Sequence, residues 1–375
     1  MAKIYRVVVI GATGQGGFGH GLQLAFDGIE RASIVAVADS NPKGLADVGR
    51  SLGVKQLYGD YKEMLAKEKA AIAVIAPSQV TNRVPMIEAA AAAGCHIYCE
   101  KPVCGTIREM DSILTALKQH DLKMGVAHQW RTAAPVRQTI RDVKAEKYGK
   151  LLRIRVRPKD DNRGGGEELL LHGSHLFDMM IALAGHPRWV SGHCQVGERD
   201  ATDDDWSEGT RPVGPILGDS ISALVGFDRG VRGYFESTAN LVPRGRKSDN
   251  LYGVWIECAR AAIRLRQPGD AFVYPAPVVM PDIEAFEWEK VWIQDWHFTR
   301  DHVPRNVRRT WVKAGNKFFA RDLIAAIEEN REPLSSLRDV RFVSEIVQGV
   351  YVSHLTGGCR VPLPLAERGH PSGVD

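Results

Sequence analysis

Short apolar runs alternate with amphipathic segments over the first 127 residues. The apolar runs predict strands near residues 5–10, 33–38, 71–76, 95–99 and 123–127. The segments between them predict helices near 20–28, 42–51, 61–67, 82–93 and 106–119. This alternation is typical of right-handed βαβ units. Residues 1–127 are therefore expected to form a doubly wound Rossmann domain with a parallel sheet.

The pattern changes after residue 127. Residues 151–157 read LLRIRVR, an alternation typical of a half-buried strand. Further strands are expected near 189–197, 219–227, 231–238, 252–258 and 261–266, and helices over 168–184, 317–330 and 338–356. Residues 128–375 therefore predict an α+β domain with a large, mainly antiparallel open sheet, in a chain of the α/β class.

A glycine-rich turn at residues 11–19 follows the first predicted strand. Glycine is needed where a strand turns sharply into a helix and a pyrophosphate approaches the backbone, because a Cβ would obstruct both. Two registers of the glycine fingerprint fit, so the phosphate-binding glycine stays open, and a loop without a ligand is the competing interpretation. The residues expected at a dinucleotide are Gly11, Thr13, Gly14, Gln15, Gly16 and Gly17.

Asp39 ends the second predicted strand. A carboxylate there accepts the hydroxyls of an adenosine ribose and repels the 2′-phosphate of NADP, so NAD is favoured over NADP. Lys43 is a reservation, since a lysine could partly offset that repulsion, and strand-end aspartates also cap helices. The cofactor set is extended by Ser40 and by Pro77, Ser78 and Gln79, which follow the third strand.

Lys101 lies between Glu100 and Pro102, just after the fourth predicted strand. The carboxyl ends of parallel strands face ligands in open α/β folds, which places this lysine at the cofactor cleft rather than on the solvated surface. As hydride leaves an alcohol carbon, the oxygen needs a base or a nearby cation. Lys101 is therefore a candidate acid/base.

These features resemble the glucose-fructose oxidoreductase, inositol dehydrogenase and MocA family (Gfo/Idh/MocA). The resemblance is carried by the turn at 5–19, Asp39, Ala76 and Pro77, the run AGCHIYCEKP at 93–102, and Gly173, His175 and Asp178. It implies hydride transfer between a nicotinamide and a sugar or cyclitol carbon. It also implies a second domain whose open sheet makes oligomer contacts, so a homodimer or homotetramer is expected.

The same resemblance implies residue roles. Glu100 and Lys101 would line the nicotinamide end, with Lys101 holding the reacting oxygen and relaying its proton. His175 would be the second catalytic residue, although a histidine on an apolar helix is more often a core residue. Asp178, three residues further on, is expected either to support the imidazole and the substrate site or to act as a structural acceptor.

Two positions depart from the family pattern. Many members carry an aspartate four residues before the histidine, where this chain has Leu171. His172 is adjacent, but one residue rotates a helix by about 100°, so it need not replace that carboxylate. Arg83 stands where a histidine is usual. Either Lys101 and His175 alone relay the proton, or the reaction differs from that of the commonest members.

Other polar residues are expected to shape a sugar-binding pocket. Tryptophan offers a flat apolar face for a pyranose, and charged groups bind hydroxyl pairs. For the arginines of 151–157, a solvated strand face is an equal alternative. The predicted substrate-binding residues are Gln129, Trp130, Arg157, Asp160, His172 and Asp178.

The composition argues against several classes of binding partner. The 49 Lys+Arg and 45 Asp+Glu give a net charge of +4 without basic runs, so no nucleic-acid partner is expected. No membrane-spanning run and no signal peptide are evident, which predicts a cytoplasmic protein without a membrane partner. The six cysteines lack a CxxC pair and predict reduced thiols rather than a metal site.

The leading hypothesis is an NAD-dependent oxidoreductase acting on a secondary hydroxyl or ketone of a sugar, glycoside or cyclitol. One alternative is a glycoside-cleaving enzyme in which transient oxidation of the sugar ring permits elimination, with no net redox change. The other is a non-catalytic NAD-binding regulator, which Leu171 keeps open.

Overall fold

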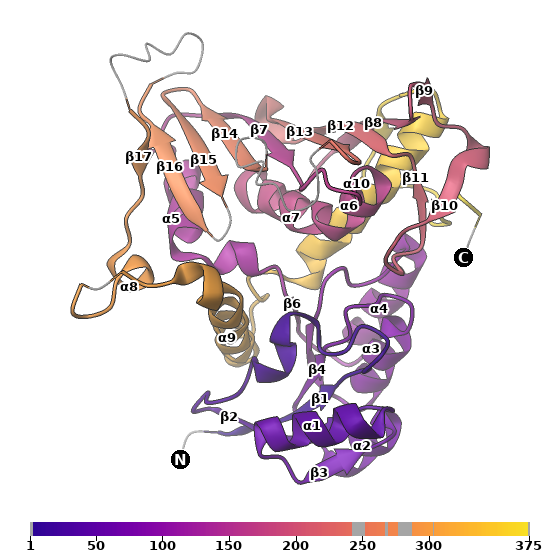
Figure 1. Ribbon diagram of the computed structural model, residues 1–375, viewed down its shortest axis with the longest axis vertical. Coiled ribbons are helices and arrows are strands. Elements are labelled where there is room, and N and C mark those ends of the chain that lie inside the picture. The colour runs from indigo at the N-terminus through magenta and orange to yellow at the C-terminus, as the bar shows by residue number, and fades with distance from the viewer. Residues whose placement is uncertain (1–2, 242–251, 267–268, 277–286, 303, 374–375) are drawn as a thin grey trace. The chain divides into compact units, whose positions relative to one another are not determined.

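The chain forms two compact units, described here from a computed structural model (Figure 1). The structure describes residues 3–241, 252–266, 269–276, 287–302 and 304–373. The first unit contains residues 1–129 and 312–340, and the second contains 130–311 and 341–375. Domains at 1–127 and 128–375 remain a prediction, and the first unit also takes in a segment from late in the chain.

A six-stranded parallel sheet forms the centre of the first unit, in the order β3-β2-β1-β4-β5-β6. Its strands are β1 (Tyr5–Ile10), β2 (Ala32–Ala38), β3 (Gln56–Tyr58), β4 (Ile72–Ile75), β5 (His96–Cys99) and β6 (Met124–Val126). Its helices are α1 (Pro42–Leu52), α2 (Tyr61–Glu68), α3 (Arg83–Ala92) and α4 (Ile107–Gln119). The predicted Rossmann fold is confirmed.

Both faces of this sheet are covered, which is why its central strands β1 and β4 are mostly apolar. Successive side chains of β1 point to opposite faces, so Val8 packs in one buried cluster and Val7 in the other. The second cluster also contains Phe319 from α9 (Val307–Glu328). This packing explains why residues 312–340 belong to the first unit.

The α-helix predicted at 20–28 is wrong. The structure has a 3₁₀ segment, η1 (Gly19–Leu24), interrupted at His20 with φ 50° and Gly21 with φ 72°. These left-handed conformations are incompatible with a continuous α-helix. The glycine turn is therefore not followed by the regular helix N-terminus that the sequence led us to expect at the pyrophosphate.

A ten-stranded sheet dominates the second unit, in the order β17-β16-β15-β14-β7-β13-β12-β8-β18, with β9 paired to β8. Strands β7 and β13 pair in parallel and their neighbours pair antiparallel, as predicted for a mainly antiparallel sheet. Its strands are β7 (Leu151–Arg157), β8 (Trp189–Val196), β9 (Arg199–Asp200), β12 (Ser220–Gly226), β13 (Arg232–Thr238), β14 (Gly253–Cys258), β15 (Ala261–Arg266), β16 (Asp270–Tyr274), β17 (Glu289–Lys290) and β18 (Val361–Pro362). Strands β10 (Trp206–Glu208) and β11 (Pro215–Leu217) form a separate pair.

Helices α6, α7 and α10 lie along one face of this sheet (Figure 1). The helices of the unit are α5 (Ala134–Lys144), α6 (Gly166–Leu171), α7 (Gly173–Ala184), α8 (Gln294–His297) and α10 (Leu337–Leu355). Phe177 of α7 packs on Phe235 of β13, with ring centroids 5.1 Å apart. Where one helix was predicted over 168–184, the structure has two helices, α6 and α7, which meet at His172. None of the described helices is both long enough and apolar enough to cross a bilayer.

Candidate functional site

The glycine turn closes on itself through its backbone. The N–H of Gly17 donates to the carbonyl of Ala12 at 2.8 Å, and the N–H of Ala12 donates back at 3.2 Å. Gly14, Gly16 and Gly17 have φ values of 89°, 94° and 56°, which side-chain-bearing residues rarely adopt. A Cβ on Gly14 or Gly17 would meet no atom within 4 Å, so this part of the backbone is open to a ligand.

Gly16 joins the turn to the segment after β4. The hydroxyl of Ser78 donates to the carbonyl of Gly16 at 2.9 Å. A Cβ on Gly16 would lie only 2.5 Å from the backbone nitrogen of Gln79. Two segments predicted to bind the cofactor are therefore in contact, and this contact requires glycine. Glycine is needed at position 11 for a different reason: a Cβ on Gly11 would overlap the ring of Phe18.

Asp39 is almost fully buried at the end of β2. Its carboxylate accepts hydrogen bonds from the hydroxyl of Thr13 at 2.7 Å, from the Thr13 N–H and from the Asn41 N–H at 2.9 Å. It thereby ties the glycine turn to the start of α1, while Ser40 is exposed. Asp39 therefore organises the turn, and its role as a ribose ligand stays a prediction.

Arg83 explains one departure from the family pattern. Its guanidinium is fully buried and donates to the carbonyls of Pro77 at 2.6 Å, Gln79 at 3.2 Å and Glu100 at 3.1 Å. A planar group with several donors suits such a task, which a lysine could not perform equally well. Arg83 therefore fastens the loop after β4 to the residue before Lys101, which is itself only 8% exposed.

His20 is a candidate that the sequence did not reveal. Its Nδ1 lies 2.6 Å from a carboxylate oxygen of Glu100, whose side chain is fully buried. The imidazole keeps 46% of its surface exposed, and the His20 carbonyl accepts a hydrogen bond from Asn316 at 3.0 Å. Because Glu100 directly precedes Lys101, His20 extends the cofactor segment with a titratable group. The irregular glycine spacing gave no signal for it.

The second unit places His175 in a polar cluster on α6 and α7. His175 is 6% exposed, and its ring centroid lies 6.1 Å from that of His172. The Nδ1 of His172 lies 3.0 Å from a carboxylate oxygen of Glu168, which is fully buried. Glu168 was not predicted from the sequence. Its signal was the spacing i, i+4, i+7 from Glu168 through His172 to His175, which would put all three on one face of a continuous helix. In the structure they lie on α6, at the junction and on α7.

Two aromatic residues complete this cluster. The ring of Tyr252 lies 5.6 Å from that of His172 and 5.9 Å from that of Trp130. The Tyr252 hydroxyl and the Trp130 indole nitrogen are buried and have no hydrogen-bond partner among the described residues. Buried donors are normally satisfied, so these two atoms point to a polar ligand. Trp130 was predicted to bind substrate and Tyr252 was not.

The other predicted substrate residues are held by protein contacts. Asp178 and Arg131 form a buried ion pair with Nε to Oδ2 at 2.9 Å, which favours the structural role left open for Asp178. Asp160 accepts from Arg157 at 2.5 Å and from the Thr238 N–H at 2.9 Å. Burial, partly offset by these donors, raises the pKa of Asp160. In the first unit, Gln129 donates to Asn316 at 3.0 Å.

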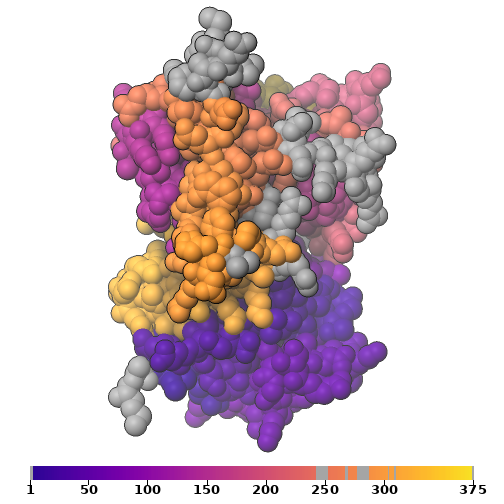
Figure 2. Space-filling model, turned by 60° about the vertical axis from the view of Figure 1, so that its left-hand side comes forward, coloured from indigo at the N-terminus to yellow at the C-terminus, as the bar shows by residue number. Residues whose placement is uncertain are grey.

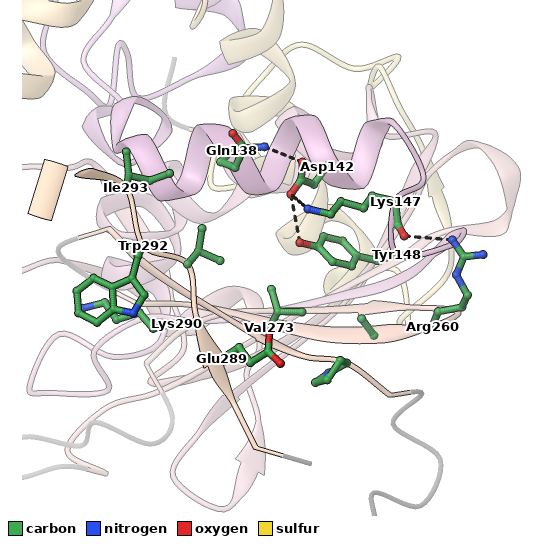
Figure 3. Close-up of a pocket in the computed structure, with 13 residues that line it drawn as sticks. Gln138, Asp142, Lys147, Tyr148, Arg260, Val273, Glu289, Lys290, Trp292 and Ile293 are labelled. Carbon is green, nitrogen blue, oxygen red and sulfur yellow. Dashed lines mark hydrogen bonds and ion pairs between the residues drawn. The ribbon is translucent and has the colours of Figure 1, made fainter. Parts of the chain in front are cut away.

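A cavity of about 630 Å³ lies elsewhere in the second unit, between α5 and the strands β16 and β17 (Figure 3). Asp142 in this cavity accepts hydrogen bonds from Gln138, Lys147 and Tyr148 at 2.7, 3.0 and 3.1 Å. Burial alone would raise the pKa of Asp142, but these donors hold it below its usual value. The carboxylate is thus satisfied from within the chain, and we do not assign the function to this cavity.

No group of three or more histidine, cysteine or acidic residues in the described part of the chain is arranged to hold a metal ion. The six cysteines are free thiols, and all but Cys359 are buried. Burial raises the pKa of Cys95 to about 11 and that of Cys99 to about 12. These thiols therefore stay protonated at neutral pH and act as core residues.

Residues 5–128 match the model of an oxidoreductase family with an NAD-binding Rossmann fold, named GFO_IDH_MocA. Over these residues, the first unit is similar to the Gfo/Idh/MocA oxidoreductase family. The predicted family and the predicted NAD-binding domain are confirmed. The glycine turn, Asp39 and the buried Lys101 described above all lie inside the matched residues.

Curated relatives of this family extend the comparison. Levoglucosan dehydrogenase of Pseudarthrobacter phenanthrenivorans is 24% identical over 230 residues, 54% of this chain and 58% of that protein. Myo-inositol 2-dehydrogenase of Thermotoga maritima is 23% identical over 164 residues, 44% of this chain and 49% of that protein. A glycosyl hydrolase family 109 protein of Shewanella amazonensis is 36% identical over 112 residues, 28% of this chain and 24% of that protein. Each match covers less than two thirds of the relative.

Solved structures of oxidoreductases share the fold over nearly the whole chain. A levoglucosan dehydrogenase in complex with NADH and levoglucosan superimposes with a TM-score of 0.74 at 20% identity, covering 96% of this chain and all of that one. An oxidoreductase from Agrobacterium radiobacter in complex with NAD+, L-tartaric acid and magnesium gives 0.73 at 16% identity, covering 96% and 98%. At these identities the likeness establishes the architecture of both units.

Proposed function

We propose that this protein is an NAD-dependent oxidoreductase acting on a secondary hydroxyl, or the corresponding ketone, of a sugar, glycoside or cyclitol. The observation that carries the proposal is Lys101, a buried lysine directly after β5 in a unit of an NAD-binding oxidoreductase family. The names of two relatives, a levoglucosan and a myo-inositol dehydrogenase, support the substrate class.

The residues of the first unit fit the dinucleotide. The backbone of Gly14 and Gly17 is free of neighbouring atoms on the side where a Cβ would lie, and a pyrophosphate needs such a surface. Asp39 offers a carboxylate for the ribose, and the same charge disfavours the 2′-phosphate of NADP. When bound, NAD supplies the acceptor or donor of the hydride.

Lys101 and His175 are proposed to handle the proton. An ammonium group near the substrate oxygen limits the negative charge that develops as the hydroxyl is oxidised. An imidazole titrates near neutral pH and can take or give the proton within the pH range of a cell. Trp130 and Tyr252 are proposed to donate hydrogen bonds to substrate hydroxyls, since their buried polar atoms have no partner among the described residues.

The proposal is tested by mixing the purified protein with NAD+ and a panel of sugars, glycosides and cyclitols and following the nicotinamide absorbance. We expect reduction of the nicotinamide with at least one member of the panel and its loss in Lys101→Met. A protein that binds no NAD, or whose turnover survives in Lys101→Met, would overturn the proposal.

The second candidate is glycoside cleavage through transient oxidation of a ring carbon. It is favoured by one observation, the 36% identity of a 112-residue segment to a glycosyl hydrolase family 109 protein. The two candidates differ in their products. Net accumulation of NADH indicates a dehydrogenase, whereas release of a free sugar with no net change in the nicotinamide indicates the cleavage cycle.

The open sheet is proposed to carry subunit contacts in a homodimer or homotetramer. A groove of about 500 Å³ crosses this sheet and is lined in part by Arg155, Tyr234, Trp255 and Trp288. Trp288 is 43% exposed, and such aromatic and arginine side chains are enriched at protein interfaces. Nearby, β16, β17 and α8 lie at the surface, as the orange atoms in Figure 2 show. Light scattering should show an oligomer that Trp288→Glu weakens, and a monomeric wild-type protein would contradict this.

A further inference from the structure

Glu168 is a fully buried carboxylate that the proposed chemistry does not yet use. A buried charge is costly unless it is paired, so its partners define its role. Arg163 lies 3.3 Å from one oxygen, and His172 lies 3.0 Å from the other. Arg163 is shared, because its guanidinium also donates twice to Asp161 at 3.0 and 2.8 Å. His172 is therefore the partner whose position depends most directly on Glu168.

The contact uses a particular nitrogen of His172. With Nδ1 3.0 Å from a carboxylate oxygen, the negative charge of Glu168 favours the proton of the neutral imidazole on Nδ1, which leaves the lone pair on Nε2. The ring is flanked by Tyr252 at 5.6 Å and by His175 at 6.1 Å between centroids. His172 therefore lies among the residues proposed to meet the substrate.

Other charged and titratable groups also face this pair. Burial alone would raise the pKa of Glu168, but His172, Arg163 and Lys159 together bring it below its usual value. Burial and the Glu168 charge raise the pKa of Tyr252 well above its usual value, so the phenol stays protonated. Two further acidic groups lie near the pair. The charge of Glu168 helps to raise the pKa of Asp160, and the carboxylate of Glu167 accepts hydrogen bonds from Thr210.

We propose that Glu168 is a positioning residue that holds His172 in its Nδ1–H form, so that Nε2 of His172 accepts the proton that Lys101 and His175 take from the substrate hydroxyl. This inference rests on the proposed function. The substrate carbon would lose a hydride to NAD+, the proton of the hydroxyl would pass through Lys101 and His175 to His172, and Glu168 would remain ionised throughout. The pair supplies, one turn earlier on the helix, the negative charge that is absent at Leu171.

The first test is a histidine-selective NMR titration of the wild-type protein and Glu168→Gln, with His172→Gln to identify the signal. We expect His172 to be protonated on Nδ1 in the neutral wild type. Removing the carboxylate should lower the His172 pKa by about one unit or more. An Nε2–H tautomer, or the same titration point in both proteins, would overturn the proposal. If Glu168→Gln does not fold, the tautomer of His172 in the wild-type protein decides whether the proposal stands.

The second test is the pH dependence of turnover. Glu168→Gln should lower kcat about tenfold or more while KM changes little, and should move the acid limb of the profile toward lower pH. The double variant with His172→Gln should be no slower than His172→Gln alone. Glu167→Gln, a buried neighbour on the same helix, is the matched control and should leave the acid limb in place. If the wild type turns over no substrate, the proposed function fails, while the titration still decides on the pair.

Discussion

The two units carry their candidate chemistry in different ways. In the first unit, the residues predicted to bind the cofactor follow successive strands, and the backbone of two of these segments is held by Arg83, which donates to three carbonyls. In the second unit, the polar residues meet through side chains on one helix face, as with Glu168 and His172. The first arrangement follows a family pattern and the second departs from it at Leu171.

This difference teaches where variation is tolerated. Close backbone contacts constrain glycine in the first unit, because a Cβ at Gly16 has no room beside Gln79. A side-chain cluster requires only that a suitable charge and a suitable imidazole lie close together. We therefore propose that Glu168, one turn before Leu171, supplies the missing charge without a change of fold.

The largest expected effect separates the chemistry from cofactor binding. Lys101→Met should lower kcat by about a thousandfold, since positioned acid/base groups contribute about 10²–10⁴-fold. The affinity for NAD should change little, because the proposed cofactor contacts come mainly from other residues. Steady-state kinetics and calorimetric NAD binding check this. Lys67→Met, at a lysine that is 61% exposed in an i,i+4 pair, is the control and should behave as wild type.

The second prediction concerns the stability of the histidine-bearing unit. Arg131→Ala should destabilise it by about 3–5 kcal/mol, because the Asp178 carboxylate is left buried without its guanidinium partner. Urea unfolding followed by tryptophan fluorescence measures the change. Arg188→Ala, which removes an exposed pair with Asp228, should have little effect. Equal losses in the two variants would contradict the structural role of Asp178.

The third prediction tests the backbone contact of the first unit. Gly16→Ala should weaken NAD binding by about tenfold or more, since φ 94° strains an alanine and its Cβ would press on the backbone of Gln79. Gly59→Ala has open space and should bind NAD as wild type does. Unchanged affinity in Gly16→Ala would show that the turn and the loop at 77–79 can separate without loss.

The smallest expected effect is on acid stability. Burial lowers the pKa of His370 to about 4. Below its unfolded pKa of about 6.5, the unfolded chain binds a proton that the folded chain accepts only near pH 4. Stability contributed by neutral His370 is therefore lost as the pH falls through this window. His370→Gln should flatten the loss in urea melts, and the exposed substitution His120→Gln should not.

Much of the fold could be predicted because its elements are long and periodic. Strands such as β1 and β7 have the predicted bounds, since burial on one or both faces imposes a simple pattern. Short strands such as β3, β9 and β17 escaped prediction, because two or three residues show no alternation. Helix α5 was also missed.

The candidate site was predictable only as far as motifs are local. Asp39 and Lys101 could be named as candidates because strand ends mark the ligand edge of a parallel sheet, and their roles stay predictions. Tyr252 and His20 were not found, because their contacts with His172 and Glu100 join residues that are 80 positions apart in the chain. The helical spacing of Glu168 from His172 and His175 could have revealed this residue. The prediction instead concentrated on position 171, where the family pattern has an aspartate and this chain has leucine.

The central claim is hydride exchange between NAD and a carbohydrate carbon, and isotope transfer tests it most directly. Sugars, glycosides and cyclitols deuterated at their secondary carbons would be incubated with the protein and NAD+, and the nicotinamide examined by mass spectrometry. Our account predicts deuterium in the nicotinamide for at least one substrate, and its loss in Lys101→Met. Tight NAD binding without deuterium transfer across the whole panel would contradict the account and favour a non-catalytic NAD-binding protein.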